Sequence, residues 1–263
     1  MAINLLCTNH PHYGYITVST SPDGSVASGV TTLRISRKVS SEYSFIAVYT
    51  KSISTASDLE LSYDDYLCRN NVTYQYRVEY LHDNGDTFSV LDSEVYNIKS
   101  TFDILILKDK YNAYYTALNA YPVTFNTVKQ YAVNTPILAK KPSYYSFANT
   151  CYQEGNCQGT WLKMIGEEND ITFETEQNWK WRKEVTEFLC EGNPKLLKSV
   201  SGEMWIVGIK TDTISDSSLF SSAEIDGARL LEFGWIEIGD VDSEEDLNEA
   251  ELISVPRKYW CSV

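Results

Sequence analysis

Alternating apolar and polar residues dominate the first hundred positions of the chain. In residues 72–80 (VTYQYRVEY), valine or tyrosine occupies every second position, and polar residues, Glu79 among them, occupy the others. A period of two puts these two sets on opposite faces of a strand, so we expect one buried face and one face in water. Asn84-Gly85 then predicts a hairpin turn, and residues 87–90 predict the partner strand.

Two further segments favour β-structure in this region. Residues 43–50 are rich in aromatic and β-branched residues and predict a strand. The sequence Ser21-Pro22-Asp23-Gly24 predicts a turn, because proline presets its φ and glycine accepts a positive φ. Residues 1–100 therefore predict a β-sandwich module.

The pattern changes after residue 100. Residues 103–108 predict a strand that is apolar on both faces. Residues 111–145 are polar and aromatic with several prolines, and they predict strands and loops whose ends the sequence does not define. Residues 155–159 begin and end with glycine and predict a turn or loop.

Residues 178–191 have the period of a helix. Asn178 is a suitable N-cap, and Gly192 followed by Pro194 is a typical helix stop. The apolar residues fall at i, i+4, i+7 and i+8 and form one stripe. This stripe consists of Trp181, Val185, Phe188 and Leu189.

Strands are expected again after the helix. Residues 194–198 and 204–209 predict a hairpin that turns at Ser201-Gly202. A further strand is predicted over residues 230–238, with Leu231, Phe233 and Trp235 on one face. The expected fold class is mainly β, with an N-terminal β-sandwich over residues 1–100. A second β domain, a sandwich or barrel with one flanking helix at about 178–191, is expected over residues 101–263.

The segment from Met204 to Ile209 is apolar on both faces, so both faces need cover. The cover comes either from its own domain, as for a buried central strand, or from a neighbouring subunit. The six tryptophans, five of which lie within residues 161–235, likewise suit either a core or interface anchors.

Composition and charge narrow the range of functions. The chain has 263 residues, a formal net charge of −14 and 19 tyrosines. An acidic chain does not neutralise phosphates, so we expect no nucleic-acid binding through a basic groove. Acidity can instead help DNA slide past a surface that lines a channel.

No run approaches the roughly 20 apolar residues of a membrane helix, and no signal peptide is evident, so we expect assembly in the cytoplasm. The six cysteines are then expected to be reduced thiols, although Cys151 and Cys157 are near enough in sequence to leave a pairing open.

Residues suited to catalysis or metal binding are few. The chain has three histidines, and His10-Pro11-His12 has an HxH pattern whose proline favours a loop over a metal site. A Gly-x-Ser-x-Gly elbow and a glycine-rich phosphate loop are both missing from the sequence. Acids are plentiful, but no pair is singled out for glycoside hydrolysis. We therefore expect no catalytic residues, no cofactor and no metal.

The acidic residues 240–251 allow two interpretations. They place acids at positions 1, 3, 5 and 12 of a calcium-binding loop, but Glu245 occupies position 6, where the sharp turn needs glycine. The interpretation that we favour is a short exposed helix, with Ser243 as N-cap and Asp246 completing a capping-box-like pair.

The N-terminal part resembles a known module. Leu67, a short spacer, Tyr74-x-Tyr76-x-Val78 and the Asn-Gly hairpin resemble the last two strands of a fibronectin type III domain. Tyr74 takes the place of that family's corner tyrosine, whereas the family's buried tryptophan is absent, because the first tryptophan is Trp161. Such modules are mostly spacers and adhesion units, so the resemblance implies architecture more than activity.

The C-terminal part resembles minor or distal tail proteins of phages that infect Gram-positive bacteria. The resemblance covers roughly residues 101–263 and is most specific over Phe188–Val207, with a Phe-Leu helix end, a Gly-x-Pro-Lys turn and a hairpin closing with Gly-x-x-Trp. Phe233-Gly234-Trp235-x-Glu237-Ile238-Gly239-Asp240 resembles the same family's later strand. The resemblance implies a fold related to tail-tube modules. The interface candidates are Trp181, Phe188, Leu189, Pro194, Lys195, Trp205, Phe233 and Trp235.

The expected function is therefore structural. The resemblance implies a virion protein of the distal tail, baseplate or hub that forms a ring of six copies around the tail channel, with tube, tape-measure, hub or fibre proteins as further partners. One alternative is an adhesion module that binds a host surface or a receptor-binding fibre through the fibronectin-like domain. Another is a carbohydrate-active enzyme of the tail tip.

Overall fold

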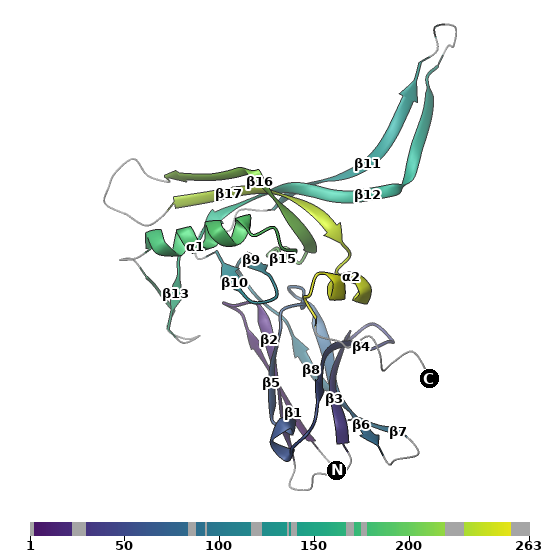
Figure 1. Ribbon diagram of the computed structural model, residues 1–263, viewed down its shortest axis with the longest axis vertical. Helices are drawn as coiled ribbons and strands as arrows, with labels where there is room; N and C mark the ends of the chain where they lie inside the picture. The colour runs from purple at the N-terminus through teal and green to yellow at the C-terminus, as the bar shows by residue number, and fades with distance from the viewer. Residues whose placement is uncertain are drawn as a thin grey trace.

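The computed structural model describes residues 3–22, 30–83, 88–92, 94–116, 123–135, 137, 141–166, 171–174, 178–218 and 229–253. It confirms a mainly β fold made of antiparallel sheets. A sandwich forms one end of the molecule, a larger sheet crosses the other, and a two-stranded arm extends from the larger sheet (Figure 1). The predicted turn over residues 21–24 and the Asn-Gly turn lie largely or wholly outside the described residues.

The N-terminal sandwich has a three-stranded and a five-stranded sheet. The first has the order β1-β2-β5, with β1 Ile3–His10, β2 Tyr15–Pro22 and β5 Leu61–Asp65. The second has the order β4-β3-β6-β7, with β4 Ile46–Ser52, β3 Val30–Val39, β6 Thr73–Asp83 and β7 Phe88–Asp92, and β8 Tyr96–Lys99 also pairs with β6. A short 3-10 helix, η1 Ala56–Leu59, precedes β5. The strand predicted from residue 43 begins at Ile46, and Tyr43 is fully exposed.

Strand β6 confirms the predicted alternation. Tyr74, Tyr76, Val78 and Tyr80 are all buried in the sandwich core. Glu79, which was expected on the wet face, is a correction, because its side chain is only 2% exposed. It is enclosed by ion pairs with Arg34 and Arg77 and accepts a hydrogen bond from Ser36.

A buried ion pair and a tyrosine hydroxyl tie the sandwich together. Asp65 is fully buried and its Oδ2 lies 2.7 Å from Arg37 Nη1. Tyr76 donates its hydroxyl proton to the same carboxylate oxygen at 2.6 Å. Five residues before Tyr74, the backbone N–H of Arg69 donates to the Tyr74 hydroxyl at 2.8 Å. This last bond has the geometry of a tyrosine corner, in which a strand tyrosine bonds to backbone a few residues upstream.

The larger sheet has seven strands in the order β10-β9-β15-β16-β17-β12-β11. The strands are β9 Ile106–Lys108, β10 Ala113–Tyr115, β11 Thr124–Asn134, β12 Ser143–Thr160, β15 Lys195–Lys198, β16 Met204–Ser218 and β17 Arg229–Gly239. A separate pair consists of β13 Met164–Ile165 and β14 Thr172–Phe173. Helix α1 Asn178–Cys190 and helix α2 Glu244–Glu249 complete the described elements. The described strands form an open sheet, with β10 and β11 at its edges.

The predicted helix is confirmed as α1. It packs Val185, Phe188 and Leu189 onto one face of the large sheet. It ends as expected before Gly192, whose φ of +75° lies in the left-handed region that favours glycine. Asn178 does not form the expected N-cap bond: its buried side-chain oxygen has no hydrogen-bond partner in the described part of the chain.

Two predicted segments of the large sheet need correction. Residues 155–159 were expected to be a turn or loop but lie inside β12. A Cβ added to Gly155 would lie 1.8 Å from the carbonyl oxygen of Thr124, so this glycine permits the close approach of β11 rather than a turn. The strand expected over residues 103–108 begins only at Ile106, although Ile104 and Leu105 are also buried.

The sandwich and the large sheet meet at a polar joint. Lys198 of β15 is fully buried, donates to the backbone oxygen of Gly14 at 2.6 Å, and has its Nζ 4.5 Å from the Phe102 ring centroid. The side chain of Asn70 donates to the backbone oxygens of Phe102 and Val200 at 2.8 and 2.7 Å. Because these bonds join both halves in a buried setting, they fix the orientation of the sandwich against the sheet.

Candidate functional site

Most of the predicted interface residues lie in the core. Five of them belong to the apolar cluster between α1 and the sheet, and each is at most 4% exposed. These five are Phe188, Leu189, Trp205, Phe233 and Trp235. Lys195 is also fully buried, with its Nζ 4.0 Å from the Phe188 ring centroid. Trp181 and Pro194 are partly buried. The tryptophans were expected either in a core or as interface anchors, and Trp205 and Trp235 therefore lie in the core. A partner contact at Trp181 or Pro194 stays a prediction.

The doubly apolar segment of β16 is covered by its own chain. Trp205 and Val207 face the cluster under α1. Met204 and Ile206 face a second cluster that contains Leu247 of α2. Figure 1 shows α2 between the large sheet and the sandwich. The alternative of a buried central strand is thus the correct one for residues 204–207.

The feature best placed to meet a partner is the β11–β12 arm. Strand β17 pairs with β12 only over residues 154–160, so the part of β12 before residue 154 has β11 as its one strand partner among the described residues. Over residues 127–134 of β11 this ribbon extends roughly 25 Å at about 3.3 Å per residue. The pairing register shifts between Lys129 and Tyr131, and an interruption of the ladder lets a ribbon bend. Figure 1 shows the ribbon turning away from the sheet.

The arm exposes apolar groups on both faces. Val133 and Tyr144 are directly opposed across the two strands and are 51% and 63% exposed. Tyr145, the next residue, therefore points to the other face, and it is 57% exposed. In the segment between β11 and β12, Ile137 is fully exposed. Strand β11 also forms an edge of the sheet, so its outward backbone groups can pair with another chain.

The sequence interpretation did not identify this arm. Its signal was two runs rich in aromatic and β-branched residues, 124–134 and 143–152, on either side of Pro136 and Pro142. Such a pattern indicates a hairpin, but it gives no sign that the hairpin leaves the sheet.

The described residues do not assemble a metal site. In the HxH motif, His10 hydrogen-bonds through Nε2 to Thr17 at 2.9 Å, and His12 Nδ1 lies 3.7 Å from Asp103. No group of three potential His, Cys, Asp or Glu ligands comes together in the described part of the chain. The acidic stretch forms α2 instead of a calcium loop, and Ser243 caps it by accepting from the N–H of Asp246. Asp246 accepts from Asp240, so the second half of the expected capping box is not formed.

The remaining expectations concern cysteines and membranes. Cys151 and Cys157 are both free thiols, and they lie six positions apart along an extended strand, roughly 20 Å and too far for a disulfide. Burial raises the pKa of the Cys157 thiol, which makes it inert. Helices α1 and α2 are too short and polar to cross a membrane, and no other described helix could do so.

Comparison with known proteins adds no relative. No protein-family model matches the chain, and no curated protein matches it in sequence.

Proposed function

We propose that this protein is a structural component of a phage tail, at the distal tail, baseplate or hub, where copies form a ring around the channel and connect the tube to the tip or fibres. The observation that carries this proposal is the β11–β12 arm, a ribbon that exposes apolar groups on both faces and an open strand edge.

A ribbon of this kind needs a partner. A two-stranded hairpin is at best marginally stable in water, and an open apolar edge invites pairing. In a ring, each arm lies against the next copy, which covers both Val133 and Tyr145. Full burial of one such side chain contributes about 1.5–3 kcal/mol, so a few contacts per subunit stabilise a closed ring.

The N-terminal sandwich supports the same proposal. Its two antiparallel sheets and the Tyr74–Arg69 hydrogen bond agree with a fibronectin type III-like module, which serves as a spacer or attachment unit. The net charge of −14 suits a channel wall past which DNA must slide.

The test is the assembly state of the purified full chain, alone and with neighbouring tail proteins, by mass photometry and cryo-electron microscopy. We expect closed rings from the unchanged protein. The double variant Val133→Lys, Tyr145→Lys should remain monomeric, because lysines on both faces of the arm oppose its burial against a neighbour.

The matched control is Tyr43→Lys, a fully exposed tyrosine of the sandwich, which should form rings as the unchanged protein does. Far-UV circular dichroism and the unfolding midpoint should be the same for all three proteins. A chain that stays monomeric with its tail partners present, or an arm variant that still forms rings, contradicts the proposal.

A further inference from the structure

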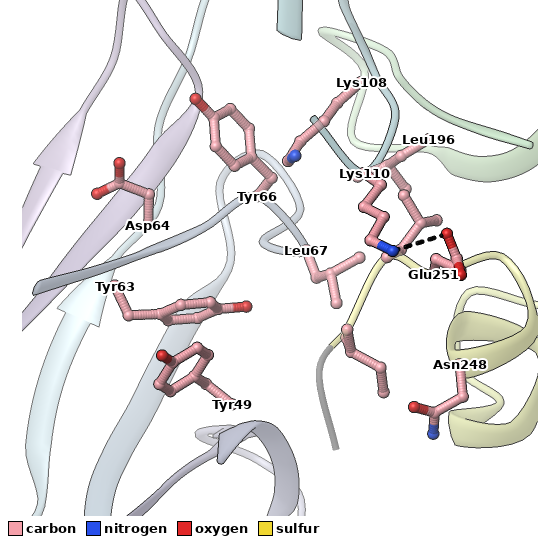
Figure 2. Close-up of a pocket in the computed structure, with 12 residues that line it drawn as sticks. Tyr49, Tyr63, Asp64, Tyr66, Leu67, Lys108, Lys110, Leu196, Asn248 and Glu251 are labelled. Atoms are coloured by element: carbon pink, nitrogen blue, oxygen red, sulfur yellow. Dashed lines mark hydrogen bonds and ion pairs between the residues drawn. The ribbon is translucent and has the colours of Figure 1, made fainter. Parts of the chain in front are cut away.

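A cleft opens at the joint between the sandwich and the large sheet (Figure 2). Its volume is about 600 Å³, within the range of small-molecule sites. Strand β5 and the segment after it form one wall, β9 and β15 form a second, and α2 with the residues after it forms a third. The lining residues are Tyr49, Tyr63, Asp64, Tyr66, Leu67, Lys108, Lys110, Leu196, Asn248, Glu251, Leu252 and Ile253.

Three tyrosines give the cleft a rigid aromatic wall. The rings of Tyr49 and Tyr63 lie 4.8 Å apart between centroids, and the Tyr63 hydroxyl donates to the backbone oxygen of Val48. Tyr66 is held by a hydrogen bond between its hydroxyl and that of Tyr115 at 2.9 Å. In Figure 2 the Tyr49 and Tyr63 rings lie side by side and the Tyr66 ring stands beside Lys108. Because neighbours fix these rings, a ligand would lose little side-chain entropy in ordering them.

Lys108 brings a positive charge to this wall. Its side chain is partly buried, its Nζ lies 5.0 Å from the Tyr66 ring centroid, and it donates to the backbone oxygen of Asp109 at 2.7 Å. Burial lowers the pKa of Lys108, against the opposing effects of Asp109 and Asp64. No carboxylate of the described residues lies within ion-pair distance of this ammonium group. A partly buried cation of this kind gains from an anionic ligand.

The second lysine of the cleft is already paired with a carboxylate. Lys110 forms an ion pair with Glu251 at 3.0 Å at the rim. Asp64 accepts a hydrogen bond from Thr17 at 2.7 Å. The Thr17 hydroxyl is uncharged and does not neutralise Asp64. Lys108 is the cleft lysine that remains for an anionic ligand, because no carboxylate of the described residues pairs with it.

We propose that this cleft binds an acidic saccharide, with its ring stacked on the tyrosine wall and its carboxylate or phosphate at Lys108. The C–H groups of a sugar face carry partial positive charge, which the negative faces of aromatic rings attract. Asn248 supplies an amide for sugar hydroxyls. A nucleotide fits less well, because the Tyr49 and Tyr63 rings are tilted against each other at 4.8 Å between centroids and leave no gap between them for a base.

This site is independent of ring formation, and it gives the joint between the sandwich and the large sheet a ligand of its own. The test is isothermal titration of the full chain with a uronic-acid disaccharide, a hexose phosphate, the neutral disaccharide of matching linkage, and adenosine monophosphate. We expect saturable binding of one or both acidic sugars, at least tenfold tighter than binding of the neutral sugar. The uronic acid and the hexose phosphate separate a carboxylate from a phosphate as the preferred anion.

Two lysine variants provide the matched pair. Lys108→Met should weaken binding of the acidic sugar at least tenfold, whereas Lys110→Met should change it less than threefold, because Glu251 already neutralises Lys110. Tyr49→Ala should weaken both acidic and neutral sugars. Each variant is first checked for an unchanged circular dichroism spectrum and unfolding midpoint.

Several results would overturn the proposal: no saturable binding by the folded protein, equal affinity for acidic and neutral sugars, tighter binding of adenosine monophosphate, or equal losses in the two lysine variants. The titration is made on the protein in whichever assembly state it adopts. A failure here therefore leaves the ring proposal standing, and a monomeric protein that binds the sugar overturns only the ring.

Discussion

The buried carboxylate of Asp65 allows a quantitative test of the sandwich core. Asp65 is fully buried and holds three donors: Arg37 Nη1 at 2.7 Å, the Tyr76 hydroxyl at 2.6 Å and the backbone N–H of Leu67 at 2.8 Å. Asp65→Asn keeps the shape but removes the negative charge, so the guanidinium of Arg37, only 7% exposed, is left without a counter-ion. The new amide N–H₂ also faces groups that donate hydrogen bonds.

The expected cost is about 3–5 kcal/mol of unfolding free energy, the range for a buried ion pair that loses one partner. For a chain of this size, that loss corresponds to a fall in Tm on the order of 10 °C. Urea unfolding is followed by far-UV circular dichroism and by tryptophan fluorescence. Because every tryptophan lies at or after Trp161, coincident curves indicate that the sandwich unfolds together with the rest.

A double-mutant cycle separates the ion pair from general damage to the core. Arg37→Met combined with Asp65→Asn removes both charges, so the double variant should be less destabilised than the sum of the single variants by about 1–3 kcal/mol. The control is Glu187→Gln, which breaks the exposed Lys183–Glu187 pair on α1 and should cost less than about 0.5 kcal/mol. Additive single effects, or a loss below about 1 kcal/mol for Asp65→Asn, would refute this reasoning.

Two further predictions concern Gly155 and alkaline pH. Gly155→Ala should destabilise the protein by about 2 kcal/mol or more, because the added Cβ would lie 1.8 Å from the backbone oxygen of Thr124. The control Gly208→Ala should cost less than about 1 kcal/mol, because the nearest contact of its added Cβ is 3.5 Å away. Equal urea midpoints for the two variants would contradict this prediction. Burial, followed by the charge of Asp65, raises the pKa values of Tyr63 and Tyr76 well above 10, so the unfolded chain releases these protons at a pH where the folded chain keeps them. The free energy of unfolding should therefore fall as the pH rises above about 10, and a urea midpoint that stays constant from pH 9 to pH 11 would show that these tyrosines ionise freely in the folded protein.

The sequence by itself determined the elements whose pattern is local. The alternation over residues 72–80 identified the strand β6 and its buried face, because side chains on a strand must alternate. The stripe from Trp181 to Leu189 and the glycine at position 192 located α1 and its end. Ser243 located α2 in the same way, since a cap bond forms within one turn of helix.

Only the tertiary structure decided matters that depend on distant partners. Glu79 is buried because Arg34, from another strand, neutralises it, and an alternation rule contains no such information. Residues 155–159 are part of a strand, in which Gly155 allows the neighbouring backbone to come close, a role that a local turn signal does not distinguish. Several predicted interface residues became core residues for a related reason: a large apolar side chain suits both settings, and the position of α1 selects between them.

The same limit applies to both proposed functional surfaces. The arm projects from the sheet because the pairing of β17 with β12 begins only at residue 154 and leaves the rest of β12 with β11 as its strand partner among the described residues. The cleft combines Tyr49 and Tyr63 of the sandwich with Lys108 of the large sheet, which the joint around Lys198 brings together. The sequence determined local conformation through periodicity and caps, whereas the location of unpaired edges and charges followed from long-range packing, which a local pattern does not encode.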